Sequence, residues 1–310
     1  MNIAILGATS QIAKDLVISF AKHTDHHCIL FSRSPENVKT WLQSLDHEHG
    51  YMSKAYVDFD KGDYDAVVNF VGVGDPARAK AVGANIFNIT YQYDQLALDY
   101  IKLYPACKYV FLSSGAVYGD VFHKPVDSDS VAQVPVNDLG DANWYAIAKL
   151  HAEARHRAFP ELSIVDVRVF NYFSHTQDMS ARFLITDIVR AIRDKTVLKT
   201  SSENIVRDFL HPDDFYQLIA CILKAEPMNM PLDCYSKSPV DKITLLNILQ
   251  QEFSLKYEIS SENSVLNATG NKMNYYSINK LALQLAYMPS FSSIETVRCE
   301  LLPLISEKGY

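Results

Sequence analysis

Short runs of apolar residues recur through the first half of the chain, and helical patterns separate them. The runs are mostly apolar rather than alternating, as expected for parallel strands covered on both faces, and they span residues 2–6, 28–31, 55–58, 66–71 and 109–112. Between the first two runs, Ile12, Leu16, Val17 and Phe20 have the spacing of an amphipathic helix. Repeated alternation of strand and helix predicts a doubly wound α/β fold with a parallel sheet.

The pattern of predicted elements changes after residue 170. A strong helical pattern runs through Phe183, Leu184, Ile188 and Ile192, but the regular alternation of strand and helix loosens. A polar stretch over residues 260–274 separates later elements, and we expect a last helix to begin near Ile278. We therefore expect a first domain over residues 1–170, to which part of 205–236 returns. A smaller α/β domain, mainly residues 171–310, would close over the mouth of the sheet.

The composition is that of an ordinary globular protein. Of the 310 residues, 48% are hydrophobic and 21% are charged, which argues against disorder and against a coiled coil. The net charge of −7 comes without a basic block, which argues against a nucleic-acid partner. No apolar stretch approaches the roughly 20 residues that cross a bilayer, and the first residues do not resemble a signal peptide. The five cysteines are scattered, so we expect a cytoplasmic protein with no membrane partner.

The turn after the first apolar run is a candidate phosphate-binding loop. Gly7 permits a tight bend, and the helix that follows would present free N–H groups and its positive end to a pyrophosphate. Only the first glycine of the usual glycine-rich pattern is present, because Ser10 and Ala13 occupy the other two positions. Taken alone, a plain β–α turn capped by Thr9 or Ser10 explains this segment equally well.

Three further segments carry polar side chains in an informative order. Tyr145 and Lys149 lie one turn apart on one face of a helix. Ser113 and Ser114 end an apolar strand, at the edge of the sheet where ligands bind in this fold class. Downstream, an Arg-Asp-Phe-Leu-His segment begins at Arg207. Each segment has an ordinary structural explanation, but their joint order and spacing argue for a shared site.

With these segments, the chain resembles an extended short-chain dehydrogenase/reductase of the nucleotide-sugar epimerase, dehydratase and reductase group, over essentially its whole length. The resemblance implies a Rossmann fold and a catalytic set of Ser114, Tyr145 and Lys149. In such a set the ammonium stabilises the phenolate of a tyrosine whose pKa is otherwise about 10. It further implies that a nucleotide-diphosphate sugar contacts Ser114, Asn171, Arg207 and Lys272, although an arginine often stands where this chain has Lys272. The implied cofactor-binding residues are Gly7, Thr9, Ser10, Gln11, Ile12, Ser32, Arg33, Val71, Lys149 and Asp58, the last closing the third strand.

The residues after the second apolar run bear on the choice of cofactor. An acidic residue there would accept the ribose hydroxyls of NAD, but Ser32 and Arg33 stand in its place. A hydroxyl and an arginine suit a 2′-phosphate, so we predict NADP, with NAD as the alternative. The ordinary explanation of Arg33 is an exposed loop residue.

One departure from the family pattern argues against one of the family's reactions, the dehydratase reaction. Dehydratases of the family carry Asp-Glu after the catalytic hydroxyl, whereas this chain has Gly115 and Ala116. We therefore predict an NADP-dependent oxidoreductase that reduces a 4-keto group of the sugar, and the alternative is an NAD-dependent 4-epimerase. A non-catalytic dinucleotide-binding regulator is a third hypothesis, against which stands the joint presence of Ser114, Tyr145 and Lys149.

The remaining polar features carry weaker signals. His175, close to Asn171, is either an extra acid or a loop residue without a catalytic part. Histidines within residues 23–27 and 47–49 have the spacing of metal ligands, but both groups fall in expected surface connections, so we predict no metal site. The helices expected around residues 85–100 and 145–157 resemble those that pair in family dimers, so we expect a homodimer.

Overall fold

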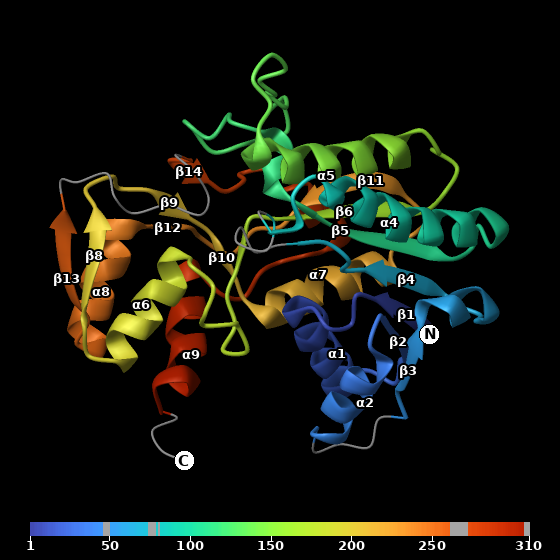
Figure 1. Cartoon of the computed structure of the whole chain (residues 1–310), viewed down its shortest axis with the longest axis horizontal. Coiled ribbons are helices and arrows are strands. Elements are labelled where there is room, and N and C mark those ends of the chain that lie inside the picture. Colours follow the sequence, from blue (N-terminus) through green and yellow to red (C-terminus); the bar gives the residue numbers. More distant parts are fainter. Residues whose placement is uncertain (46–49, 74–78, 80, 261–271, 307–310) are drawn as a thin grey trace.

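A seven-stranded parallel sheet forms the centre of the computed structural model, which describes residues 1–45, 50–73, 79, 81–260 and 272–306 (Figure 1). Its strand order is β11-β6-β5-β4-β1-β2-β3. The strands are β1 (Asn2–Leu6), β2 (His27–Ser32), β3 (Met52–Ala55), β4 (Ala66–Asn69), β5 (Lys108–Ser114), β6 (Ile164–Val169) and β11 (Asn229–Asp233). The order reverses between β1 and β4, which is the switch point of a doubly wound fold, so the predicted fold class is confirmed.

Two layers of helices cover the sheet. Helices α1 (Gln11–His23), α2 (Pro35–Gln43) and α7 (Pro212–Lys224) lie on one face, and α4 (Asn85–Leu103) and α5 (Asp141–Arg157) lie on the other (Figure 1). Leu16, Val17 and Phe20 of α1 are buried against the sheet, on the apolar face that the sequence predicts. The strands are apolar on both sides because each side faces a helical layer.

A second hydrophobic core belongs to the smaller region on the left of Figure 1. It is built from α6 (Leu184–Arg193), α8 (Lys242–Phe253) and α9 (Ser293–Ser306), beside the parallel pair of β8 (Val197–Ser201) and β13 (Lys256–Ser260). Two small sheets of short strands accompany this region. In one, β7 (Asn171–Tyr172) pairs with β10 (Phe209–Leu210). In the other, β9 (Val206–Arg207) lies between β12 (Val240–Asp241) and β14 (Asn274–Tyr275). Between β10 and β12 the chain returns to the main sheet as α7 and β11.

The third strand differs from the expected one. It ends at Ala55 rather than at residue 58, and residues Tyr56–Lys61 form the 3-10 helix η1, so the position predicted for this strand is wrong. The tighter helix turns two aromatic rings inward: Phe59 packs edge-on against Phe31, and Tyr56 stacks on the same ring. Burial of these rings outweighs the local preference of the segment for an extended conformation.

The last helix also differs from the expected one. No α-helix begins near Ile278 in the described part of the chain; a short 3-10 helix, η3 (Leu281–Leu285), follows it, and the last α-helix, α9, begins at Ser293. The Ser277 hydroxyl accepts the N–H of Asn279 at 3.0 Å, and the Asn279 side chain accepts the N–H of Leu281 at 3.1 Å. Such local bonds compete with helix formation, which explains the delayed start. Most of the polar stretch over residues 260–274 lies outside the described residues.

The strand ends place the predicted site residues together. Gly7 follows β1, Ser32 ends β2, Val71 follows β4, Ser114 ends β5, and Asn171 follows β6. Parallel strands have their carboxyl ends at one edge of the sheet, so residues from distant parts of the chain line that edge.

Candidate active site

Gly7 closes the turn between β1 and α1 in a conformation that favours glycine. Its φ is +78°, and a Cβ at this position would lie 2.9 Å from the backbone nitrogen of Val71. Helix α1 begins after Ser10, whose side chain makes no capping bond, and the first turn of α1 carries no acidic residue. Because the free N–H groups and the positive end of the helix are open to an anion, a dinucleotide diphosphate fits this loop.

Two buried polar atoms at the same edge have no hydrogen-bond partner in the described part of the chain. They are the hydroxyl of Ser32, a residue only 2% exposed, and the side-chain nitrogen of Gln11. Buried polar groups are normally hydrogen-bonded, so both atoms fit a ligand that brings its own acceptors. Arg33 beside Ser32 is exposed, as are Thr9 and, in part, Ile12.

Asp58 lies in η1 instead of at the end of β3. Its carboxylate forms an ion pair with Lys61 at 2.7 Å, and the hydrogen bond and charge of that ammonium lower the pKa of Asp58. The pair is exposed to solvent, so the contact of Asp58 with an adenine amino group stays a prediction. Tyr56, the first residue of η1, contacts the candidate phosphate-binding loop instead. Its hydroxyl accepts the N–H of Gly7 at 3.0 Å.

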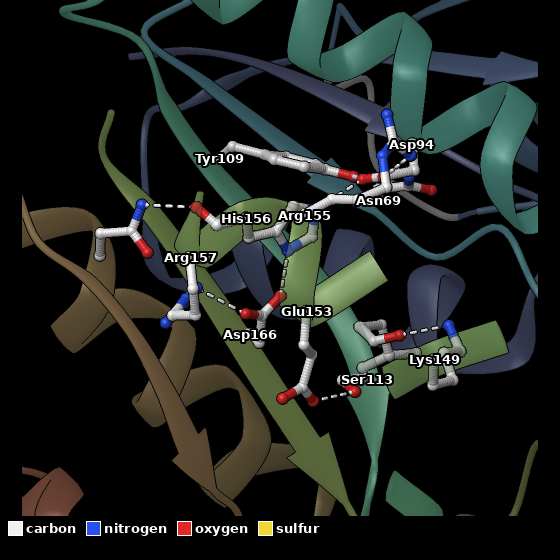
Figure 2. Close-up of polar contacts among 12 residues, drawn as sticks. Asn69, Asp94, Tyr109, Ser113, Lys149, Glu153, Arg155, His156, Arg157 and Asp166 are labelled. Atoms are coloured by element: carbon white, nitrogen blue, oxygen red, sulfur yellow. Dashed lines mark hydrogen bonds and ion pairs between the residues drawn. The ribbon is translucent and has the colours of Figure 1, made fainter. Parts of the chain in front are cut away.

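Strand β5 and helix α5 bring the three predicted catalytic side chains together. Ser114 is buried at the end of β5 and forms a hydrogen bond with the hydroxyl of Tyr145. Lys149 follows one turn later on α5 and is 4% exposed. Its ammonium donates to the carbonyl oxygen of Leu112 at 2.6 Å (Figure 2). The same ammonium lies 4.3 Å from the ring centroid of Phe111.

Burial controls the proton affinities of the phenol and the ammonium. It raises the pKa of Tyr145, although the hydrogen bond with Ser114 opposes the shift. It lowers the pKa of Lys149 to about 8, although nearby carboxylates, Asp94 foremost, oppose the shift. At neutral pH Tyr145 is therefore a protonated phenol, able to donate a proton, beside a lysine that is mainly charged.

Two cations with lowered pKa values lie at the three-stranded sheet, Arg207 on β9 and Lys272 two residues before β14. Arg207 on β9 is 5% exposed, and its Nη1 donates to the carbonyl oxygens of Val206 and Lys272, each at 2.8 Å. Burial lowers the pKa of Arg207 to about 10. Burial and the charge of Arg207 together lower the pKa of Lys272 to about 8, although the charge of Asp120 opposes the shift. An anion bound between them would favour both charged forms, so the pair fits a diphosphate group.

Tyr275 connects these cations with Ser114, the predicted catalytic serine. Its hydroxyl lies 3.3 Å from Ser114 Oγ, and its ring centroid lies 5.9 Å from Arg207 Cζ and 4.9 Å from Lys272 Nζ. Its carbonyl oxygen accepts the side-chain N–H of Asn171 at 3.3 Å. The predicted substrate-binding residues therefore surround a tyrosine that sequence reasoning missed. No motif marks it, because only the pairing of β14 with β9 places Tyr275 opposite Arg207.

Gly115, directly after the predicted catalytic Ser114, has no space for a side chain. A Cβ there would lie 2.3 Å from a ring carbon of Phe170. Phe170 in turn packs against Tyr118 and Tyr275, so its ring is held from other sides. An acidic side chain at position 115 therefore does not fit, which agrees with the missing Asp-Glu pair.

His175 is held by α9. Its Nδ1 lies 2.7 Å from Glu300 Oε2, its backbone N–H donates to the same oxygen at 2.8 Å, and the other carboxylate oxygen lies 3.1 Å from His211 Nε2. These contacts give His175 a place in the packing of α9 against the 171–183 segment.

No group of three or more histidine, cysteine, aspartate or glutamate side chains within the described ranges could hold a metal ion. Residues 47–49, with two of the histidines considered from sequence, lie outside those ranges. Of the helices in the described residues, none has the length and apolar character of a membrane span.

Comparison with known families gives one match, to the NAD dependent epimerase/dehydratase family, over residues 3–230. A comparison with curated proteins found no significant match.

Solved structures share the fold at low sequence identity. UDP-glucuronic acid 4-epimerase from Bacillus cereus, in complex with UDP-glucuronic acid and NAD, has a TM-score of 0.78 at 17% identity, covering 99% of this chain and 100% of its own. UDP-N-acetylglucosamine 4-epimerase from Methanobrevibacter ruminantium has a TM-score of 0.79 at 18% identity, covering 99% of each chain. dTDP-glucose 4,6-dehydratase from Bacillus anthracis, in complex with NAD, has a TM-score of 0.75 at 16% identity, covering 99% and 97%.

Proposed function

The chain belongs to the NAD dependent epimerase/dehydratase family, and from this premise we propose that it is an NADP-dependent oxidoreductase that reduces the 4-keto group of a nucleotide-diphosphate sugar. The observation that carries the proposal is the arrangement of the polar side chains around Ser114. The hydroxyls of Ser114 and Tyr145 meet beside Lys149, and the ring of Tyr275 leads from Ser114 to the cations Arg207 and Lys272. A sugar bound with its diphosphate on these cations would have its ring beside Tyr275 and its reacting oxygen at Ser114.

A bound nicotinamide dinucleotide would supply the hydride. The loop at Gly7 and the open end of α1 would hold its diphosphate, and Lys149 would contact the ribose next to the nicotinamide. The partnerless hydroxyl of Ser32 and the exposed guanidinium of Arg33 favour a 2′-phosphate, because both can donate to it and no carboxylate follows β2 directly. These contacts are the reason for proposing NADP instead of NAD.

Tyr145 would move the proton. The keto oxygen would take the phenolic proton of Tyr145 and become a hydroxyl, while the carbon would gain the hydride that the dinucleotide supplies. Lys149 stabilises the phenolate left behind, which then regains a proton from solvent. Ser114 and Tyr275 donate to the same oxygen while its negative charge develops. The raised pKa of Tyr145 supports the reducing direction, because a phenol that holds its proton is ready to act as an acid.

A 4-epimerase is the second candidate, and the fold comparison favours it. Two of the structures that the chain resembles are 4-epimerases, and each aligns over 99% of this chain. An epimerase would keep NAD bound, oxidise the sugar and return the hydride to the opposite face of the same carbon. The same Ser114, Tyr145 and Lys149 would serve both directions, so the two candidates differ in cofactor exchange and not in the catalytic set.

The deciding experiment follows absorbance at the nicotinamide band. The purified protein is mixed with NADPH or NADH and a panel of 4-keto sugars carried on UDP, CDP, dTDP or GDP. Stoichiometric oxidation of NADPH supports the reductase, whereas interconversion of unreduced sugar nucleotides without added cofactor contradicts it and supports the epimerase. Tyr145→Phe is the matched variant, because it should abolish turnover and retain dinucleotide binding. Dinucleotide binding with neither activity would support a non-catalytic regulator.

We also propose a homodimer that pairs through α4 and α5. The two helices pack side by side on one face of the sheet, and Tyr91 on α4 is 48% exposed, with the guanidinium of Arg155 4.4 Å from its ring centroid. Light scattering at working concentration tests this proposal, and a monomeric mass would contradict it.

A further inference from the structure

A cluster of buried charges lies between α4, α5 and the sheet, and the proposed reaction does not use it (Figure 2). His156 of α5 is 0% exposed, with Nε2 2.7 Å from Asp94 Oδ1 on α4 and Nδ1 2.6 Å from Asp166 Oδ1 on β6. Ionised carboxylates only accept hydrogen bonds, so both ring nitrogens donate and the ring is an imidazolium. Burial opposes this charge, but the two carboxylates outweigh it and raise the pKa of His156 to about 9.

Two arginines complete the cluster. The Nη1 of Arg155 lies 2.6 Å from Asp94 Oδ2, and the Nη2 of Arg157 lies 2.6 Å from Asp166 Oδ2. Removing such charges from water costs several kcal/mol for each ion, and well-packed apolar residues often stabilise a core equally well. Stability alone therefore does not account for the cluster.

Hydrogen bonds lead from the cluster to the loop after β4. Asp94 Oδ1 accepts the O–H of Tyr109 at 2.9 Å, and the Tyr109 oxygen accepts the side-chain N–H of Asn69 at 2.9 Å. Asn69 Oδ1 accepts the backbone N–H of Val71, again at 2.9 Å. This is the backbone nitrogen against which Gly7 packs, so the buried charges fix one wall of the phosphate loop.

The same loop touches the catalytic lysine. A Cβ on Gly72 would lie 3.2 Å from Lys149 Nζ, so the backbone next to Val71 limits where the ammonium can move. Three carboxylates raise the pKa of Lys149 against the effect of burial, and they come from three elements: Asp94 of α4, Glu153 of α5 and Asp166 of β6. The cations paired with these carboxylates are Arg155, His156, Arg157 and Arg168.

We propose that Asp94 is a positioning residue of the active site, which fixes the β4 loop against Gly7 and Lys149 through Tyr109 and Asn69. This inference rests on the proposed function, because it assigns a part in the same dinucleotide and hydride site. Asp94 has two separable effects, one through hydrogen bonds and one through charge.

Tyr109→Phe isolates the hydrogen-bond effect. The variant breaks the connection between Asn69 and Asp94 but leaves every charge in place. We expect the dissociation constant of NADPH, measured by nicotinamide fluorescence, to rise about 3- to 10-fold, because one hydrogen bond of about 1 kcal/mol no longer holds the loop. The pH profile of kcat/KM should keep its position.

Asp94→Asn tests the charge effect. Loss of a negative charge disfavours the ammonium, so the pKa of Lys149 should fall and the alkaline limb of kcat/KM should move to lower pH. Asp94 is the foremost of the carboxylates that act on Lys149, so we expect the limb to move by about half a unit or more. A purely structural role would lower activity without moving the limb.

Asp99→Asn is the matched control, since Asp99 lies on the same helix, is exposed and bonds only to Gln95 among the described residues. If wild type binds NADPH but Tyr109→Phe and Asp94→Asn match Asp99→Asn in affinity and pH profile, the positioning role is wrong and the proposed function stands. If wild type binds no nicotinamide dinucleotide, both are wrong. Should Asp94→Asn fail to fold by circular dichroism, the NADPH affinity of Tyr109→Phe decides.

Discussion

The hydroxyl of Tyr275 is expected to contribute to turnover, although no catalytic motif contains it. Tyr275→Phe removes this one oxygen, which lies 3.3 Å from Ser114 Oγ. That distance is longer than the usual ~2.7 Å of an O–H···O bond, so the hydroxyl can donate instead to a sugar oxygen placed beside Ser114. Burial raises the pKa of Tyr275, so the group stays a donor over the working range of pH.

The magnitude follows from the charge that develops during reduction. A hydrogen bond to a charged oxygen contributes about 1.5–3 kcal/mol, and about 1.4 kcal/mol corresponds to a tenfold change in rate. We therefore expect kcat/KM of Tyr275→Phe to fall roughly 10- to 150-fold, mostly in kcat, because the donor acts on charge present only in the transition state. The free energy of unfolding should change by less than about 1 kcal/mol, because the bond lost in the resting site is long.

The assay is NADPH oxidation over a series of keto-sugar concentrations, which separates kcat from KM. Tyr276→Phe is the control, because Tyr276 is the adjacent tyrosine and its hydroxyl forms no hydrogen bond within the described residues. The reasoning fails if Tyr275→Phe keeps kcat within twofold of wild type and of Tyr276→Phe while Tyr145→Phe is inactive.

Three more variants test other parts of the structure. Gly115→Ala places a Cβ 2.3 Å from the Phe170 ring, so thermal denaturation should show a loss of about 1–3 kcal/mol from overpacking. Arg33→Ala should raise the KM for NADPH about tenfold and leave that for NADH unchanged, because one charge-assisted bond to a 2′-phosphate is lost; equal effects on both cofactors would contradict NADP preference. Hydrogen bonds from His211 and His175 outweigh burial and lower the pKa of Glu300 to about 2, so its stabilisation is present above about pH 4.5 and disappears as the pH falls towards 2. Glu300→Gln should therefore reduce the urea-unfolding free energy at pH 7, by about 1–3 kcal/mol, and the gap to wild type should narrow at pH 3.

Local periodicity was enough to predict most of the main sheet and its first helix. The apolar run at residues 2–6 is β1, and the face of Leu16, Val17 and Phe20 is the buried face of α1, because strand and helix periods are properties of neighbouring residues. The same reasoning placed the third strand too late and the last helix too early. In both segments the outcome depended on contacts that periodicity does not contain: rings packing on Phe31, and side-chain bonds to the backbone at Ser277 and Asn279.

The candidate site likewise contains residues that were predicted from sequence and a contact that was not. Ser114, Tyr145 and Lys149 are predicted from sequence through the family resemblance of their segments, and of their relations only the spacing of Tyr145 and Lys149 on one helical turn of α5 is local. The relation of Ser114 to Tyr275 could not be predicted, since the two residues are 161 positions apart and meet only when β14 joins the small sheet beside β9.

The sequence by itself determined the alternation of strands and helices, the tight turn at Gly7 and the helix that carries Tyr145 and Lys149, because each depends on residues a few positions apart. Only the tertiary structure decided the electrostatics of the site. The pKa of Lys149 depends on how deeply it is buried and on Asp94 and Asp166, which come from a different helix and strand. Buried charges need partners, those partners are contributed wherever the chain packs, and packing is a property of the whole fold.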